Sequence, residues 1–203
     1  MTGRRNGLLA MIVAGAALLL PGHCLAARVI LPRPGDIGFA GFGQYGTFTK
    51  AGEIGDEFGA GAGFGVRLRY RMRYERGLGL TFERQGFDPR HKSTEDTAAV
   101  NCTLIATGLE IYQMFGTRTR ATKMLSAGVG LAQVTQKLND NETLVSGTGV
   151  GDGFFVSLGG GLEHFFWQSW AVDVSFRYHA VILHETTNHD FQIAAGLVFY
   201  ASN

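Results

Sequence analysis

Side chains alternate between apolar and polar types along several segments of the chain, and this alternation restricts the fold more than any other feature. In residues 172–182, apolar side chains occupy every second position, and polar or charged ones occupy four of the five positions between them. A period of two separates the two kinds onto opposite faces of a strand, which a helix with 3.6 residues per turn cannot do. Segments 64–72 and 78–85 repeat the pattern. The chain is therefore expected to be built from strands.

About eight such strands, most of ten or more residues, are expected between Asp36 and Tyr200. They cover residues 37–48, 59–71, 78–87, 100–115, 122–136, 153–166, 171–183 and 189–200. Short breaks at 72–77, 116–121 and 167–169 alternate with mostly longer, more polar breaks at 49–58, 88–99, 137–152 and 184–188. This asymmetry is typical of outer-membrane barrels. The predicted fold class is all-β, an eight-stranded antiparallel up-and-down transmembrane β-barrel over residues 36–203.

The first 26 residues have the features of a secretory signal peptide. Arg4 and Arg5 precede an apolar run over residues 8–20, and Cys24-Leu25-Ala26 offers a cleavage site between small residues. The run is too short to cross a hydrocarbon core of roughly 30 Å comfortably. Residues 27–35 would then form a short periplasmic lead-in, since an even number of strands places both termini on the periplasmic side.

Alternation alone does not say which face of the barrel meets water. Soluble strands usually have about 5 or 6 residues, whereas a tilted membrane strand needs about 9 to 11. Aromatic residues also gather at predicted strand ends, where an interfacial girdle is expected. They are Phe165, Phe166, Trp167, Trp170, Phe199 and Tyr200. Together with the secretory signal, these features favour a barrel whose apolar face meets lipid.

If the apolar face meets lipid, the opposite face supplies a charged interior. The lumenal charge network expected there consists of Arg67, Arg69, Arg71, Arg177, Glu83, Glu110, Glu163 and Asp173. An eight-stranded barrel has an interior just wide enough for side chains to fill. Buried charges are tolerated when they are paired and hydrogen-bonded. We therefore expect these groups to pair and to fill the barrel without a standing pore.

The charged, cysteine and histidine residues argue against a nucleic-acid partner, an internal disulfide and a metal site. Removal of Arg4 and Arg5 with the signal leaves 16 of the 18 basic residues against 17 acidic ones, which argues against a nucleic-acid partner. Only Cys102 would remain, so no internal disulfide is expected. The group of His179, His184, Glu185 and His189 matches no metal-binding motif. No metal or cofactor is predicted.

The last two predicted strands carry a resemblance to a known family. Residues 176–179 (FRYH) and 189–200 (HDFQIAAGLVFY) form a pattern that resembles the closing hairpin of the OmpA/OmpX-like small outer-membrane β-barrels. The resemblance implies an outer-membrane location and recognition of the last strand by the barrel-assembly machinery. The chain differs in continuing through Ala201-Ser202-Asn203 after its last aromatic residue.

The same hairpin is also similar to lipid A deacylase barrels, which would imply an esterase using a His-x-Ser pair and a carboxylate. His179 matches the histidine, but Val181 stands where that family carries the nucleophile. Ser175 shares a face with His179, yet lies about 13 Å away along a strand, too far for a nucleophile and its base. His179 is therefore the single candidate for enzymatic chemistry.

The function predicted from sequence is a non-enzymatic protein of the cell outer membrane, in contact with membrane lipid and lipopolysaccharide. Its extracellular loops, especially 88–99 and 137–152, would give it a structural or surface-interaction role with an unknown partner. A lipid A deacylase-type hydrolase and a small-solute porin are the alternatives. Fold class by itself does not choose among them.

Overall fold

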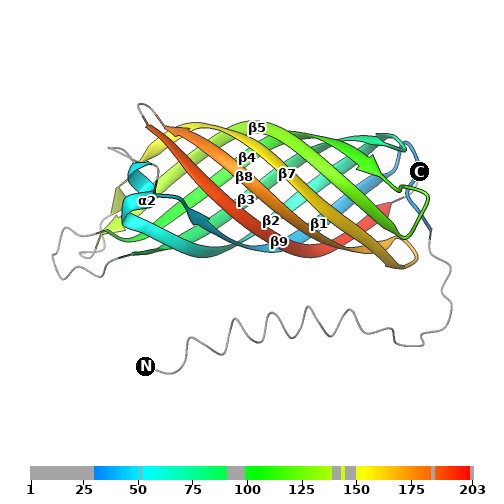
Figure 1. Cartoon of the computed structure of the whole chain (residues 1–203), viewed down its shortest axis with the longest axis horizontal. Coiled ribbons are helices and arrows are strands. Elements are labelled where there is room, and N and C mark those ends of the chain that lie inside the picture. Colours follow the sequence, from blue (N-terminus) through cyan, green and yellow to red (C-terminus); the bar gives the residue numbers. More distant parts are fainter. Residues whose placement is uncertain are drawn as a thin grey trace, which may run out of the picture.

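Antiparallel strands account for most of the computed structural model, which describes residues 30–50, 52–90, 99–138, 143–144, 150–183 and 186–201. The expected signal peptide, residues 1–26, lies outside this part of the chain. Eight long strands wind around one axis, as the ribbon in Figure 1 shows. They are β1 (Ile37–Phe48), β2 (Phe58–Arg73), β3 (Arg76–Pro89), β4 (Ala99–Phe115), β5 (Ala121–Leu138), β7 (Gly151–Trp167), β8 (Trp170–Leu183) and β9 (Thr186–Ala201).

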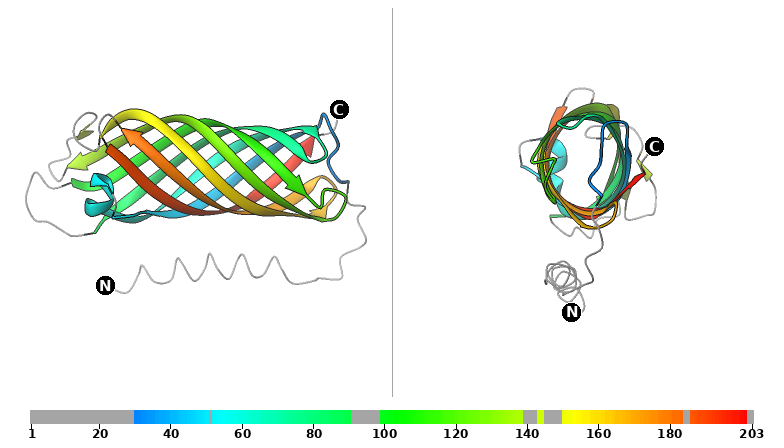
Figure 2. Two further views of the ribbon diagram at one scale, coloured as in Figure 1. Left: turned by 45° about the horizontal axis from the view of Figure 1, so that its top comes forward. Right: turned by 90° about the vertical axis from the view of Figure 1, so that its right-hand side faces the viewer.

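Each long strand pairs with the next one along the chain, and β9 pairs with β1, so that the sheet closes on itself (Figure 2). All these pairings are antiparallel. A two-residue strand, β6 (Thr143–Leu144), adds to the end of β5. The predicted fold class is confirmed, and each observed strand contains the segment predicted for it.

The two ends of the barrel differ. At the turn end, pairs of strands are joined by the short connections 74–75, 116–120 and 168–169. Gly116 and Gln168 have positive φ values of 71° and 40° there, as tight turns require. The lead-in attaches to this end, where the Ile30 amide donates to the Gln168 carbonyl over 3.0 Å. The opposite, loop end carries three longer connections and one of two residues, 184–185, because β9 begins at Thr186 and takes up most of the predicted break 184–188.

A short helix, α2 (Glu53–Glu57), interrupts the first of these longer connections at the loop end. Its Ile54 side chain is only 1 % exposed. The Ile54 amide donates to Asn188 Oδ1 over 3.0 Å, which anchors the helix to the start of β9. In the described residues, no helix is long and apolar enough to cross a membrane.

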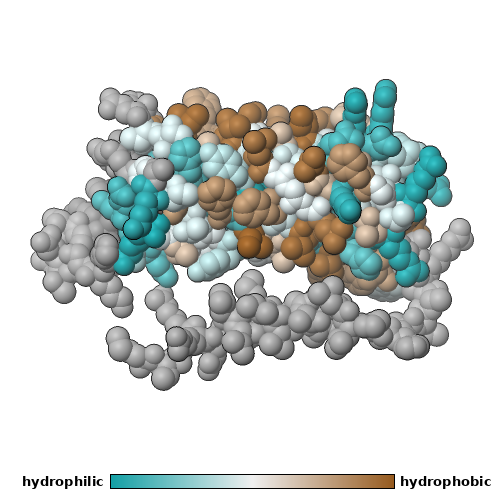
Figure 3. Space-filling view, viewed as in Figure 1, coloured by the Kyte–Doolittle hydropathy of each residue, from teal (hydrophilic) through white to brown (hydrophobic). Residues whose placement is uncertain are grey.

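The outer face of the barrel is apolar. Many large side chains that alternation places outward are 37–65 % exposed, among them Phe64, Leu109 and Phe154. Figure 3 shows such residues gathered over the middle of the barrel, with hydrophilic side chains toward both ends. A surface of this kind is stable in hydrocarbon and unfavourable in water.

Candidate functional site in the barrel interior

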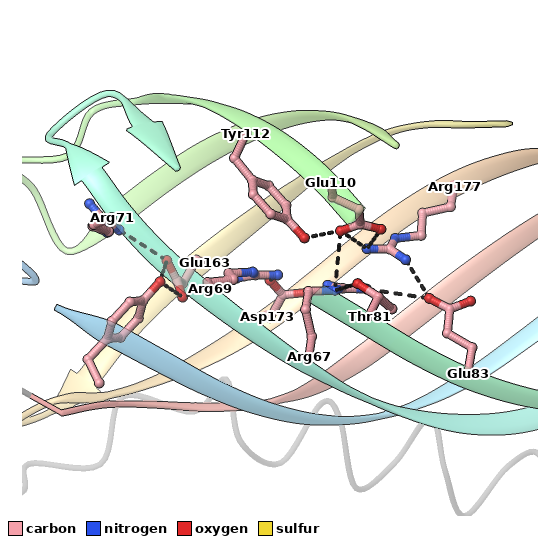
Figure 4. A network of polar contacts seen from close by, with 11 residues as sticks. Arg67, Arg69, Arg71, Thr81, Glu83, Glu110, Tyr112, Glu163, Asp173 and Arg177 are labelled. Carbon is pink, nitrogen blue, oxygen red and sulfur yellow. Dashed lines mark hydrogen bonds and ion pairs between the residues drawn. The ribbon is translucent and has the colours of Figure 1, made fainter. Parts of the chain in front are cut away.

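All eight charged side chains expected in the lumen are at most 3 % exposed. Four strands other than β2 contribute the partners of its three arginines, so residues more than 90 positions apart meet in the interior (Figure 4). Arg71, although near a turn, is fully buried. The geometry divides these groups into two clusters at different depths.

The lower ion-pair cluster lies nearer the turn end and consists of Arg69, Arg71, Glu163, Asp173 and Tyr200. Arg69 approaches Asp173 to 2.7 Å and Glu163 to 3.4 Å. Arg71 reaches the other oxygen of Glu163, also at 3.4 Å. The Tyr200 hydroxyl donates to the same carboxylate over 2.9 Å. Glu163 is therefore the hub that compensates two buried guanidinium groups.

The middle ion-pair cluster consists of Arg67, Arg177, Glu83, Glu110 and Tyr112. Arg177 hydrogen-bonds to Glu83 and lies 2.8 Å from Glu110. Arg67 lies 3.7 Å from Glu83 and 3.6 Å from Glu110, and the Tyr112 hydroxyl donates to Glu110. Two arginines thus share two carboxylates, and each charged group has two partners of opposite charge.

Aromatic rings cover the arginines, and glycines make room for the rings. The guanidinium carbon of Arg67 lies 4.5 Å from the Phe42 ring centre, and that of Arg71 lies 5.3 Å from the Tyr200 ring centre. Such contacts stabilise a desolvated cation. A side chain at Gly65 would meet the Phe42 ring at 2.4 Å. Glycine at this inward position therefore leaves space that the filled interior needs.

His179, the enzymatic candidate, lies above the middle cluster and is 1 % exposed. The register places Ser157 opposite it on β7 and Asp190 opposite it on β9. The three do not form a catalytic relay, because the Gln192 amide stands between histidine and acid. It lies 3.3 Å from His179 Nδ1 and donates to Asp190 Oδ2 over 2.6 Å.

His179 Nε2 has no hydrogen-bond partner within the described part of the chain, so Ser157 is not activated by it. The Phe155 ring, 5.2 Å from the imidazole, separates it from the loop end. In the same part of the chain, no group of three or more His, Cys, Asp or Glu residues could hold a metal ion. His184 and Glu185 lie outside it.

An apolar cluster fills the interior at the loop end, above these polar groups. Its members are Phe48, Ile54, Phe58, Phe87, Cys102, Leu104, Ala106, Ala132, Val134, Phe155, Val181 and Leu183. Each is at most 4 % exposed. Helix α2 contributes Ile54, and Arg90 ties the segment down by donating to the carbonyls of Gly55 and Phe48, both over 2.7 Å.

Sequence reasoning missed this apolar section, since it assigned charged residues to the interior and apolar residues to the lipid face. The prediction of an aromatic girdle was also wrong for Phe165 and Tyr200, which are 0 % and 2 % exposed. Alternation turns them inward and Phe166 outward, with 45 % exposure. A register shift between Phe165 and Trp167 leaves Trp167 outward as well, with 49 % exposure. The two-residue period of the sequence indicated both the inward apolar residues and the inward position of Phe165 and Tyr200.

Comparison with known proteins places this geometry among membrane barrels. A family model described as the outer membrane protein beta-barrel domain matches residues 14–199. No curated protein matches the chain by sequence.

Several solved structures share the fold at low identity. OprG of Pseudomonas aeruginosa aligns with a TM-score of 0.61 at 11 % identity, over 86 % of this chain and 100 % of that one. Neisserial surface protein A aligns with 0.56 at 12 %, over 81 % and 98 %. Ail, the attachment invasion locus protein of Yersinia pestis, aligns with 0.53 at 12 %, over 81 % and 99 %.

Proposed function

Because the chain belongs to the outer membrane protein beta-barrel family and lies in the outer membrane, we propose that it is a non-enzymatic surface-interaction protein with a filled lumen. Its loops meet the partner, and the barrel holds those loops in place. The observation that carries this proposal is that the inward side chains are buried and packed into two ion-pair clusters and an apolar cluster.

A filled interior disfavours the porin alternative. Water and ions need a continuous polar path, and the apolar cluster with Ile54 of α2 occupies the loop end of the lumen. The deacylase alternative is disfavoured because His179 is buried beneath that cluster, without an activated serine. The chemistry left available to the protein is that of its loops.

The four loops have an acidic character. The connections at the loop end, residues 49–57, 90–98, 139–150 and 184–185, together contain eight acidic and three basic residues. The similar barrel Ail has been solved with the heparin analogue sucrose octasulfate, a polyanion, at 15 % identity and a TM-score of 0.51. The acid excess here favours a partner with a basic surface instead, since opposite charges steer association.

Orientation and processing belong to the same proposal. Residues 1–26 direct export and are removed, and residues 27–35 remain as a periplasmic lead-in. The turn end then faces the periplasm and the loop end faces the outside, where lipopolysaccharide surrounds the barrel. The last strand, β9, would be the segment recognised by the barrel-assembly machinery.

The test combines conductance, lipid hydrolysis and surface binding. The purified protein is expected to give no stable conductance steps in planar bilayers and to leave the acyl pattern of lipopolysaccharide unchanged. Cells that produce a variant with Glu95, Asp96, Asp140 and Glu142 neutralised to glutamine or asparagine should lose adhesion to a basic polymer-coated surface, while the barrel keeps its fast-migrating unheated gel band. Steady conductance would overturn the proposal in favour of a porin. Hydrolysis abolished by His179→Ala would overturn it in favour of an enzyme.

A further inference from the structure

We propose that the turn end of the barrel carries a binding surface for the phosphate groups of anionic phospholipids. The surface is a cationic collar made of Arg33, Arg73, Arg76, Arg118, Arg120 and Lys123. Assignment of these lipids to the periplasmic leaflet rests on the orientation proposed above, but the binding itself does not.

The collar is exposed and uncompensated. All six side chains are exposed, and only one exposed acid, Glu75, lies among the described residues of this end. Within the described part of the chain, no ion pair joins a collar residue to an acid. Arg73 and Arg76 are direct partners in the β2–β3 register, and like charges placed opposite each other are destabilising. A bound anion would relieve this repulsion.

Two adjoining hollows receive such an anion. One, of about 440 Å³, lies between the lead-in and the turns, and the other, of about 500 Å³, lies between the turns 74–75 and 116–120. Tyr74, Thr117 and Arg118 line both. The first also carries Ile30 and Leu31, so it presents apolar and cationic groups side by side. An amphiphile with a negative headgroup fits this combination.

The position of the collar favours lipid over a soluble anion. Outward side chains just inside it are apolar or aromatic, with Met72, Phe115 and Trp167 exposed by 43 %, 47 % and 49 %. Aromatic residues mark the level of the headgroups, and long cationic side chains extend from hydrocarbon toward it. Clustered basic residues at that level attract anionic lipids.

The charge is also segregated along the barrel. The collar faces one end with six cations, whereas the loop segments at the other end contain more than twice as many acids as bases. This segregation matches a binding surface for anionic headgroups at one end of the barrel only.

Native mass spectrometry of the intact protein in neutral detergent tests the proposal, with phosphatidylglycerol and phosphatidylcholine as competing probes. The wild type is expected to retain phosphatidylglycerol in preference, and added salt should weaken the preference. Arg76→Gln with Arg118→Gln should weaken phosphatidylglycerol retention at least roughly tenfold. The matched control, Lys50→Gln with Lys137→Gln, removes two exposed cations of the loop end and should retain the preference.

Equal retention of the two lipids by the wild type, or an unchanged preference in the collar variant, would overturn the proposal. Competition with inorganic phosphate separates the sources of the phosphate group. If low millimolar phosphate displaces the lipid completely, the collar is a site for free anions. Labelling of cysteines introduced at either end of the barrel in intact cells reports orientation separately. A reversed barrel would refute the periplasmic assignment while leaving the lipid measurement valid.

Discussion

The two halves of the barrel interior obey the same alternation but differ in how their inward side chains are paired. Toward the turn end, the interior contains four arginines paired with carboxylates within 4 Å, together with two smaller apolar clusters. Toward the loop end, twelve buried apolar residues pack into one cluster, and no charged residue belongs to it. The difference shows that the inward face of a membrane barrel is not defined by polarity but by being closed to lipid.

Substitutions in the two halves should therefore destabilise the barrel for different reasons. Removal of one member of a buried ion pair leaves a desolvated charge. Removal of an apolar side chain leaves a cavity, whose cost depends on how far the neighbours relax. In the lower half the cost depends on which partner remains, and in the upper half it depends on the volume removed.

The largest effect is expected from Glu163→Ala, which deprives both Arg69 and Arg71 of their shared carboxylate. The variant should lose about 3–5 kcal/mol of unfolding free energy, measured as the urea dependence of the fast-migrating gel band. The exposed acid Glu57 provides the control, since Glu57→Ala should change stability by less than about 0.5 kcal/mol. Equal losses in the two variants would contradict a special role for the hub.

Leu104→Ala probes the apolar cluster and should cost about 2–3 kcal/mol by creating a cavity. Leu104 is 2 % exposed, whereas Leu109 on the same strand faces lipid and is 65 % exposed. Leu109→Ala in the same lipid should therefore cost clearly less. If the lipid-facing substitution proves the more damaging in urea titrations, the interior at the loop end is not tightly packed.

Arg71→Met added to Glu163→Ala should restore about 1–2 kcal/mol, because it removes the cation that the first change leaves unpaired. Glu163 is the only acid paired with Arg71 in the described residues. Arg67→Met serves as the contrasting second change, since Arg67 pairs with Glu83 and Glu110 instead. It should deepen the loss. Double-mutant cycles measured under identical conditions distinguish the two cases.

The smallest effect is expected at the loop end, from Asn188→Ala. Loss of the hydrogen bond to the Ile54 amide should raise hydrogen exchange at that amide roughly fivefold to tenfold, corresponding to about 1 kcal/mol locally. Global stability should hardly change, because the strands remain paired. Unaltered exchange at Ile54 would mean that the apolar contacts of α2 keep the helix in place without the hydrogen bond to Asn188.

The strand pattern was readable from the sequence because each strand meets two different surroundings. Residues 64–72 alternate so regularly that their outward and inward faces could be assigned before any contact was known. The strand ends were less defined, since β2 and β5 continue beyond the predicted 59–71 and 122–136 to Phe58–Arg73 and Ala121–Leu138. Backbone hydrogen bonds between neighbouring strands continue beyond the lipid-facing part of the barrel. A strand can therefore be longer than its alternating segment.

Partners inside the barrel were not readable in the same way. Sequence reasoning found the charged residues but not that Glu163 joins two arginines, that Tyr200 donates to it, or that Asp190 lies opposite His179. These contacts depend on the stagger between strands, which shifts partners by several residues around the barrel. Stagger is a property of the closed sheet, and no local sequence pattern indicates it.

The sequence by itself determined a membrane-spanning antiparallel barrel and the faces of its regularly alternating segments, such as 64–72, because both follow from a two-residue period and strand length. Only the tertiary structure decided how the interior is filled, with arginines paired near the turns and an apolar cluster beneath α2 at the loops. The physical reason is that a lipid-facing side chain needs only to be apolar, whereas a buried one needs a specific neighbour, and closure of the sheet selects that neighbour.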